Sequence, residues 1–248
     1  MALYLIGLGL ADHTDVSVKG LQIIKKCAKI YLESYTGLMA CEKAEFEKLY
    51  QRTIDIAGRE LVEGETLVDE ARDEDVALLV PGDPLAATTH IELMMACRQA
   101  SVEVRVLHNA SVLTAISQTG LQLYKFGKTT SIPLYEENFK PEAFFDILVE
   151  NQSIGAHTLL LLEIRIPRFV SVNNAIELLL AIAKARKSKA FSPSTVCVAC
   201  CRLGYSDQLI RAGTASELIK LDFGNAPHCL IVPGKMHFRE EEFLKFLI

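Results

Sequence analysis

The chain has 248 residues, half of them hydrophobic, with a formal net charge of −5 at pH 7 and a pI near 5.7. This length is enough to bury a sizeable core, either as one large α/β unit or as two small domains. The acidic balance argues against a protein that binds nucleic acid mainly through charge, because such a protein needs a broad basic face. The one dense basic run, Lys184 to Lys189, lies at the end of an expected helix, where positive charge complements the helix dipole.

The sequence carries no targeting or metal signature. No apolar stretch is long enough to span a bilayer, and the opening MALYLIGLGLADH lacks the basic start of a secretory signal, so we expect a cytoplasmic protein that does not enter a membrane. Seven cysteines, an odd number, indicate reduced thiols. Cys197 and Cys200 are three residues apart in TVCVACCRLG, so on a strand they point to opposite faces and cannot share one metal ion. We therefore expect buried structural cysteines and no metal site.

Short apolar runs alternate with segments of helical periodicity in the first half of the chain, which is the pattern of βα units. Strands are expected at residues 3–7, 29–33, 76–80 and 102–108, and helices at residues 16–27, 91–100 and 111–119. The first half is therefore expected to form a mostly parallel sheet with helices on its faces.

The pattern changes after Gly120, where the strands lie farther apart and are richer in hydroxyl groups. Strands are expected within residues 128–135, 157–166, 194–203 and 227–234, with one long helix at 173–189. This spacing predicts a separate mixed sheet with flanking helices. We expect two α/β domains, residues 1–110 and residues 111–248.

The segment IGLGLADHTD follows the first expected strand and resembles a dinucleotide-binding turn, but the third glycine of that motif is replaced by Asp12. Asp12 and Asp15 together would place negative charge at a helix N-terminus, where a pyrophosphate binds in dinucleotide-binding proteins. A neutral or cationic ligand fits better. The alternative is that the glycines only form a tight turn and that Asp15 caps the helix through the amides of Ser17 and Val18.

The segment VPGDPLAATTH ends an apolar strand with a turn that its prolines stiffen. Ligands of open α/β sheets bind beyond the carboxyl ends of the strands, and this loop follows one such end. Asp83 can accept hydrogen bonds from an amino or hydroxyl group, while Ala86 and Ala87 leave room for a flat ring. No lysine or arginine is present, which excludes a dedicated phosphate site. Alternatively, Asp83 acts only as a turn and helix-capping residue.

The segment HNAS, His108 to Ser111, follows another expected strand in the same way. Ser111 can cap the next helix while its neighbours expose backbone amides. A single histidine such as His108 is more often a turn or core residue than a catalyst. The sequence shows no Ser/His/Asp arrangement, phosphate-binding lysine motif or paired carboxylates, so the chemistry is expected to come from a bound reagent.

Further stretches, including YLESYTGLM, GLQLYKFGKT, HTLLLLEIR and DFGNAPHCLIVPGK, extend these motifs over nearly the whole chain. In this order they resemble the diphthine synthases, methyltransferases of the tetrapyrrole methylase superfamily. PGDP alone occurs across that superfamily, whereas HNAS together with GLQLYKFGK and ATTH is characteristic of the diphthine synthases.

The resemblance implies a two-domain tetrapyrrole methylase-like fold, a homodimer, and S-adenosylmethionine bound in a cleft between the domains, with S-adenosylhomocysteine as the product. It places the cofactor against loops of both halves of the chain. The cofactor-binding residues that it implies are Leu10, Asp83, Ala86, Ser111, Val112, Leu162, Leu203 and His228.

The resemblance also implies the reaction, which is methyl transfer to the amino group of a modified histidine on translation elongation factor 2 during diphthamide biosynthesis. The stretches RVLHNAS and GLQLYKFGK favour the version that also esterifies a carboxylate. Methyl transfer depends on positioning more than on a strong base, so no catalytic base is expected. The alternatives are a sibling methylase acting on a tetrapyrrole or ribosomal RNA, and a non-catalytic adapter that binds the cofactor and the elongation factor.

Overall fold

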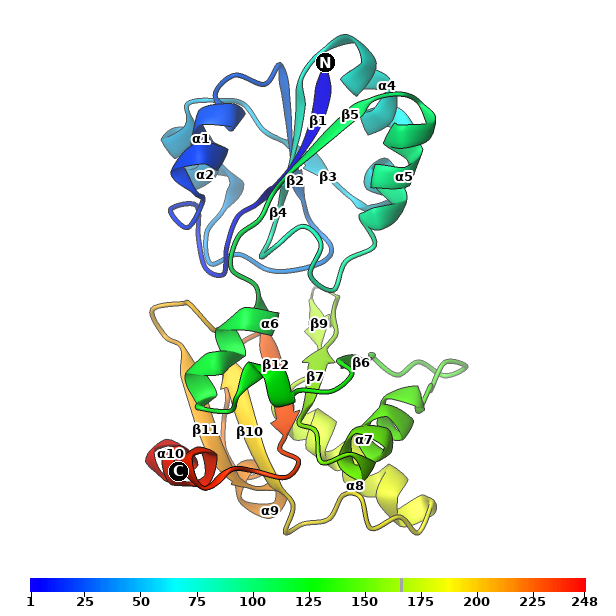
Figure 1. The fold of residues 1–248 in the computed structure, drawn as a ribbon, viewed down its shortest axis with the longest axis vertical. Coiled ribbons are helices and arrows are strands. Elements are labelled where there is room, and N and C mark those ends of the chain that lie inside the picture. Colours follow the sequence, from blue (N-terminus) through cyan, green and yellow to red (C-terminus); the bar gives the residue numbers. More distant parts are fainter. Residues whose placement is uncertain (166) are drawn as a thin grey trace. The chain divides into compact units, whose positions relative to one another are not determined.

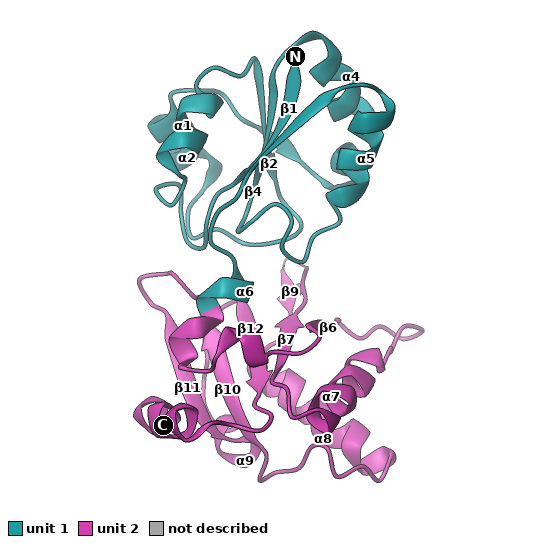
Figure 2. Ribbon diagram, viewed as in Figure 1, with its two compact units in different colours: residues 1–115 teal, residues 116–248 magenta. Residues whose placement is uncertain are grey.

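The computed structural model describes residues 1–165 and 167–248, so Ile166, the last residue of one expected strand, lies outside the described residues. The chain divides into two compact units, residues 1–115 and 116–248 (Figure 2). The expected division near residue 110 lies a few residues before this point. Each unit contains its own five-stranded sheet with helices, so the α/β class predicted from the sequence is confirmed.

The sheet of the first unit is entirely parallel and has the strand order β3-β2-β4-β1-β5. Its strands are β1 (Ala2–Gly7), β2 (Lys29–Glu33), β3 (Asp55–Ala57), β4 (Val76–Val80) and β5 (Glu103–Leu107). Its helices are α1 (Val18–Ile24), α2 (Lys43–Tyr50), α3 (Arg59–Glu63), α4 (Thr66–Asp73), α5 (Ile91–Gln99) and α6 (Val112–Ala115).

Helices cover both faces of this sheet, with α1 and α2 on one face and α4 and α5 on the other (Figure 1). Alternate residues of β1 therefore belong to two different cores. Tyr4 and Ile6 join the cluster that includes Phe46 of α2, while Leu3 and Leu5 join the opposite cluster. Burial on both faces explains why the central strands are continuous apolar runs in the sequence.

The sheet of the second unit is mixed, as expected, with the order β11-β10-β12-β7-β6 and a single parallel pair, β6 with β7. Its strands are β6 (Thr130–Ile132), β7 (Thr158–Leu162), β10 (Val196–Cys201), β11 (Leu209–Thr214) and β12 (His228–Val232), and a separate hairpin pairs β8 (Ile164–Arg165) with β9 (Arg168–Phe169). The helices are α7 (Ala143–Ser153), α8 (Val172–Ala185), α9 (Ala215–Leu218) and α10 (Phe238–Leu244), with short 3₁₀ turns η1 (Ile116–Thr119), η2 (Leu123–Lys125) and η3 (Lys245–Leu247).

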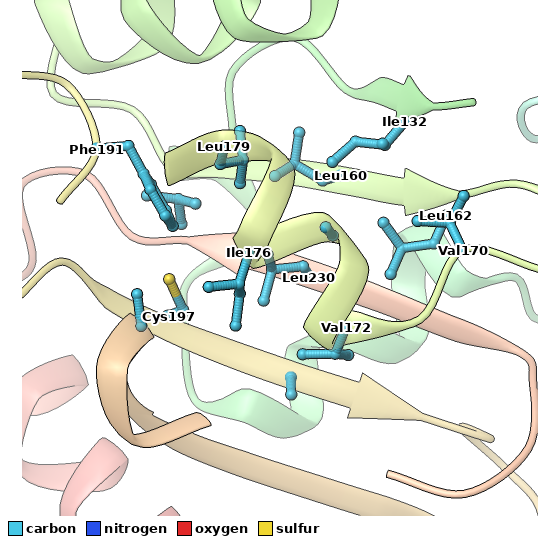
Figure 3. Close-up of a cluster of buried hydrophobic side chains, with 14 of the residues drawn as sticks. Ile132, Leu160, Leu162, Val170, Val172, Ile176, Leu179, Phe191, Cys197 and Leu230 are labelled. Carbon is cyan, nitrogen blue, oxygen red and sulfur yellow. The ribbon is translucent and has the colours of Figure 1, made fainter. Parts of the chain in front are cut away.

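The core of the second unit forms where the apolar face of α8 packs on the sheet. Figure 3 shows Ile176 and Leu179 of α8 in the same cluster as Leu160 of β7 and Leu230 of β12, all of them buried. A spacing of three residues places these two α8 side chains on one face of the helix. The basic run lies at and just beyond the end of α8, where Arg186 forms ion pairs with carboxylates near the start of α7.

All seven cysteines are free, and six of them are buried. Cys197 joins the core under α8, whereas Cys200 faces Cys229 across the β10–β12 pair, so the predicted opposite orientation is confirmed. Burial raises the pKa of the Cys197 thiol, which keeps it protonated. Among the described residues, no cluster of three or more His, Cys, Asp or Glu side chains is arranged to hold a metal ion, and no helix is long and apolar enough to cross a bilayer.

Candidate functional site

The loops that follow β1 and β4 are joined at the carboxyl edge of the first sheet. Leu8 donates its amide to the Val80 carbonyl at 2.9 Å, and Gly9 and Gly82 exchange two backbone hydrogen bonds of 3.1 and 2.7 Å. Both glycines have positive φ, +86° and +74°. A Cβ on Gly7 would lie 2.7 Å from the Gly82 carbonyl oxygen. The glycines after β1 therefore allow two loops to approach closely, which is a different role from cradling a pyrophosphate.

Asp83 is held by three donors within the first unit. The Leu85 amide donates to Oδ1 at 2.9 Å, and the Asn109 amide and His108 Nδ1 lie 3.1 and 2.8 Å from Oδ2. Burial opposes ionisation, but these hydrogen bonds outweigh it, and the pKa of Asp83 lies below its usual value. An ionised carboxylate has about four acceptor positions, and these three donors account for three of them.

Asn109 connects three loops, and the sequence had not singled it out. Its Nδ2 donates to the carbonyls of Gly7 and Asp15, both at 3.0 Å, while its backbone amide holds Asp83. The only feature of the sequence that pointed to Asn109 was its position inside the HNAS segment. Because β4, β1 and β5 are neighbours in the sheet, this one residue after β5 reaches β1 and its loop through its side chain and the loop after β4 through its backbone amide.

Asp15 does not cap α1, so the capping part of that alternative is wrong. Ser17 is the cap, with its hydroxyl accepting from the Gly20 amide at 3.0 Å. Asp15 turns back toward its own loop, where Oδ2 accepts from the amides of Leu10 and Ala11 at 3.2 and 2.7 Å. Its negative charge is therefore directed at the turn after β1, where two amides stabilise it.

The structure places five of the sequence-predicted cofactor residues at this one edge of the first unit. They are Leu10 in the turn after β1, Asp83 and Ala86 after β4, and Ser111 and Val112 at the start of α6. Ala86 closes the turn by donating to the Asp83 carbonyl at 3.2 Å, and the Ser111 carbonyl accepts from Ala115 at 2.9 Å. A Cβ on Gly82 would lie 3.9 Å from Ser111, so the two loops adjoin.

The other three predicted residues meet at one edge of the second unit's sheet. Leu162 ends β7, His228 begins β12, and Leu203 follows β10. The antiparallel register pairs Cys229 with Leu161 and His228 with Cys201, which puts the end of β7, the start of β12 and the end of β10 side by side. All three predicted residues are buried.

The imidazole of His228 is the most unusual group at this edge. It lies edge-on to the rings of Phe169 and Phe223, with centroids 5.4 and 6.4 Å away. Neither ring nitrogen makes a hydrogen bond of normal geometry within the described residues, although the backbone of Asn225 and Phe223 lies close enough to favour the charged ring. Burial outweighs this and lowers the pKa of His228, so the ring is neutral. A buried polar group without a partner is uncommon and destabilising, which indicates a ligand-binding role.

The comparisons with known proteins decide the family. A family model described as Tetrapyrrole (Corrin/Porphyrin) Methylases matches residues 2–219 of the chain. The chain belongs to the tetrapyrrole methylase family. It is therefore a methyltransferase, as predicted from the sequence.

Within this family, the methylase is similar to proteins named for diphthine. The diphthine methyl ester synthase of Dictyostelium discoideum is 42% identical, with 99% of this chain and 97% of the relative covered. The corresponding protein of Schizosaccharomyces pombe is 40% identical over 98% and 93% of the two chains. A crystal structure of a diphthine synthase superposes with a TM-score of 0.90 at 31% identity, covering 100% of this chain and 96% of that one. The predicted tetrapyrrole methylase-like fold and the resemblance to diphthine synthases are confirmed.

Arg202 is a second residue of the methylase that the sequence had not identified. Its Nη1 donates to the carbonyls of Phe223 and Asn225, both at 2.7 Å, and its Nε pairs with Asp207 at 2.7 Å. These contacts fix the loop that supplies the Phe223 ring beside His228. A backbone-binding arginine leaves no periodic signal in a sequence, so only the three-dimensional contacts identify it.

Proposed function

We propose that this methylase transfers methyl groups from S-adenosylmethionine to the modified histidine of translation elongation factor 2 in diphthamide biosynthesis, and that it forms the methyl ester. The support is that relatives aligned over 98–99% of this chain are named diphthine methyl ester synthase. The number of methyl groups is proposed to be four, three on nitrogen and one on the carboxylate. An enzyme confined to nitrogen methylation would give three.

The chemistry of the site residues fits this cofactor. S-adenosylmethionine carries its reactive methyl group on a positively charged sulfur, so it supplies the electrophile when bound. The loop of residues 81–90 contains no lysine or arginine and holds the ionised Asp83, which favours a cationic ligand. The two ring nitrogens of His228 are buried and make no hydrogen bond of normal geometry within the described part of the chain, so they are suited to a polar ligand group. This imidazole is the single observation that carries the cofactor proposal.

The residues of this chain then act by binding and orienting. Leu10, Asp83, Ala86, Ser111 and Val112 are proposed to contribute from the first unit, and Leu162, Leu203 and His228 from the second. The buried leucines exclude water from the ligand, and the neutral imidazole donates or accepts without adding charge. Because the displacement at a sulfonium needs alignment with the acceptor, positioning by these residues is the main source of rate.

Elongation factor 2 is the proposed protein substrate, in the cytoplasm. A homodimer is also proposed, since a mean hydropathy of +0.23 is high for an acidic chain and is consistent with surface buried between subunits. Light scattering measures this directly, and a mass of 27.4 kDa at micromolar concentration would contradict the dimer.

The decisive experiment supplies methyl-labelled S-adenosylmethionine and elongation factor 2 that carries the unmethylated histidine modification. We expect label on the elongation factor, a mass increase of four methyl groups, and loss of one of them in mild base, because an ester hydrolyses and a methylated amine does not. Elongation factor without the modification is the control and should stay unlabelled. Binding of S-adenosylhomocysteine with no transfer would instead support the adapter, and no binding at millimolar concentration would reject a methyltransferase that uses this cofactor.

A further inference from the structure

A fully buried glutamate–histidine pair lies in the first unit, outside the set of proposed cofactor residues. Glu33 is the last residue of β2, and His90 directly precedes α5. Both side chains are 0% exposed, and Glu33 Oε2 lies 3.5 Å from His90 Nε2. Burying two ionisable groups is costly unless each is satisfied by a partner, so this pair calls for a role.

The hydrogen-bond partners determine where the protons are. His90 Nδ1 lies 2.8 Å from the Pro84 carbonyl oxygen, which can only accept, so Nδ1 carries a proton. Glu33 accepts from the amide and the hydroxyl of Thr36 at 2.7 and 2.8 Å. Nε2 has no hydrogen-bond partner in the described part of the chain, and Glu33 Oε2 lies beside it at 3.5 Å. The ring is therefore held on its Nδ1 side by the Pro84 carbonyl and faces the Glu33 carboxyl on its Nε2 side.

The pair acts on the loop after β4 through a single carbonyl group. The Pro84 oxygen accepts from His90 and also from the Thr88 hydroxyl at 2.6 Å, which closes residues 84–90 into a compact turn. Ala87 within that turn has a φ of +60°, an uncommon conformation for a residue with a Cβ, so the surrounding contacts must hold it. Pro84 lies directly between Asp83 and the segment that contains Ala86.

We propose that His90 is a positioning residue for cofactor binding: it donates to the Pro84 carbonyl and so fixes the loop of Asp83 and Ala86, while Glu33 orients its ring. This inference rests on the proposed function, since the loop position matters for affinity only if the loop binds the cofactor. Glu33 and His90, the histidine of ATTH, are not among the proposed cofactor contacts, and the inference gives both of them a role.

Two substitutions at position 90 separate positioning from general stability. The amide nitrogen of asparagine can replace Nδ1, whereas that of glutamine can replace Nε2. His90→Asn therefore keeps the donor to Pro84 and loses the contact with Glu33, and His90→Gln does the reverse. By calorimetry with S-adenosylhomocysteine, we expect His90→Gln to raise Kd about tenfold, as for loss of one well-placed hydrogen bond, and His90→Asn to stay within about threefold of the unchanged protein.

Melting temperatures provide the matched control, because both variants remove the same ring and should lose similar stability. Hydrogen exchange of the Ala86 amide, which donates to the Asp83 carbonyl, should accelerate in His90→Gln and stay slow in His90→Asn. Equal Kd values, or equal exchange rates, in the two variants would overturn the positioning role.

The exchange measurement needs no ligand, so it keeps the inference separate from the proposed function. If the unchanged protein failed to bind S-adenosylhomocysteine, the proposed function would fail together with the role of His90 in affinity, and the exchange rates would still decide whether His90 fixes the loop. If neither position-90 variant folds, Glu33→Ala serves as the second test. It leaves the imidazole without its orienting partner and should raise Kd several-fold, and an unchanged Kd in that variant would refute the inference.

Discussion

Asp83 and His108 are joined by a hydrogen bond of 2.8 Å between Oδ2 and Nδ1. With the amides of Leu85 and Asn109, this contact makes Asp83 the residue that links the turn after β4 to the end of β5. The turn-forming role considered from the sequence is therefore present in the structure. Ligand binding is the second proposed role of Asp83, and mutation can separate the two roles.

Replacing Asp83 with alanine leaves two backbone amides without their acceptor. We expect the free energy of unfolding to fall by about 1–3 kcal/mol, the usual result of losing the partner of buried donors. If the carboxylate also binds the cofactor, the Kd for S-adenosylhomocysteine should rise about tenfold or more. Denaturant unfolding and calorimetry on the same variant measure both, and lost stability with unchanged affinity would assign Asp83 to the turn alone.

His108→Ala is the matched control for that variant. Its side chain is 66% exposed, and a contact made by a largely exposed side chain contributes little, so the free energy of unfolding should fall by less than about 1 kcal/mol. Affinity should change less than in Asp83→Ala. A larger loss of affinity from His108→Ala would show that the imidazole itself meets the ligand.

Asn109→Ala removes the side chain that holds the loops after β1 and β5 together. Two hydrogen bonds to backbone carbonyls are lost, and we expect about 1–3 kcal/mol less stability. Asn138→Ala, on an exposed segment of the second unit, is the control and should be neutral within about 0.5 kcal/mol. Unfolding in urea measures both, and equal midpoints for the two variants would contradict the role of Asn109.

His228→Leu should affect stability and binding in opposite directions. The change removes two buried polar atoms that make no hydrogen bond of normal geometry with the residues the structure describes, so the melting temperature should stay the same or rise. The Kd for S-adenosylhomocysteine should rise about tenfold if a ring nitrogen meets the ligand. Thermal unfolding with and without the ligand checks both expectations, and a variant that binds as tightly as the parent would remove His228 from the site.

Glu240 gives the protein a specific sensitivity to acid. This buried carboxylate of α10 accepts from the amides of Gln122 and His237, from the Lys125 ammonium and from His157 at 3.1 Å. Burial opposes ionisation, but these donors prevail and lower the pKa of Glu240 to about 2. A carboxyl group with a lowered pKa stabilises the folded state at pH values above the ordinary pKa of that group, about 4.5. This contribution disappears as the pH falls toward 2.

The linked stability is on the order of 3 kcal/mol, and Glu240→Gln removes it. Urea unfolding between pH 2 and pH 5 should therefore show a flatter pH dependence for the glutamine variant than for the parent. Parallel curves for the two proteins would show that Glu240 is not the group responsible.

The sequence predicted the parts of the fold whose burial creates a regular pattern. β1, β4, β7 and β12 are apolar runs because both of their faces are covered, and α8 has a clear apolar face. The short strand β3 was missed because two of its three residues are exposed. The strand β11 was missed for a similar reason, since most of its side chains are only partly buried. Both strands are defined by backbone pairing with a neighbouring strand, and their side chains show no apolar pattern that would reveal this in the sequence.

The candidate site was predictable where it follows strand ends. Asp83 and Ser111 lie in the loops that follow β4 and β5, and parallel strands place such loops at one edge of the sheet. Asn109 and Arg202 were missed because their partners are backbone carbonyls far away in the chain. The prediction that Asp15 caps α1 was wrong because Ser17, two residues later, accepts the hydrogen bond from the first turn of the helix.

The distribution of cysteines makes the unfolding of each half separately observable. Cys27, Cys41 and Cys97 belong to the first unit, and the other four belong to the second. Burial raises the pKa of Cys27 to about 11, so this thiol reacts slowly with maleimides and iodoacetamide while the protein is folded. The rate at which the cysteines of each unit become alkylated, followed by peptide mass mapping, therefore measures when that unit unfolds. No cysteine has to be introduced by mutation.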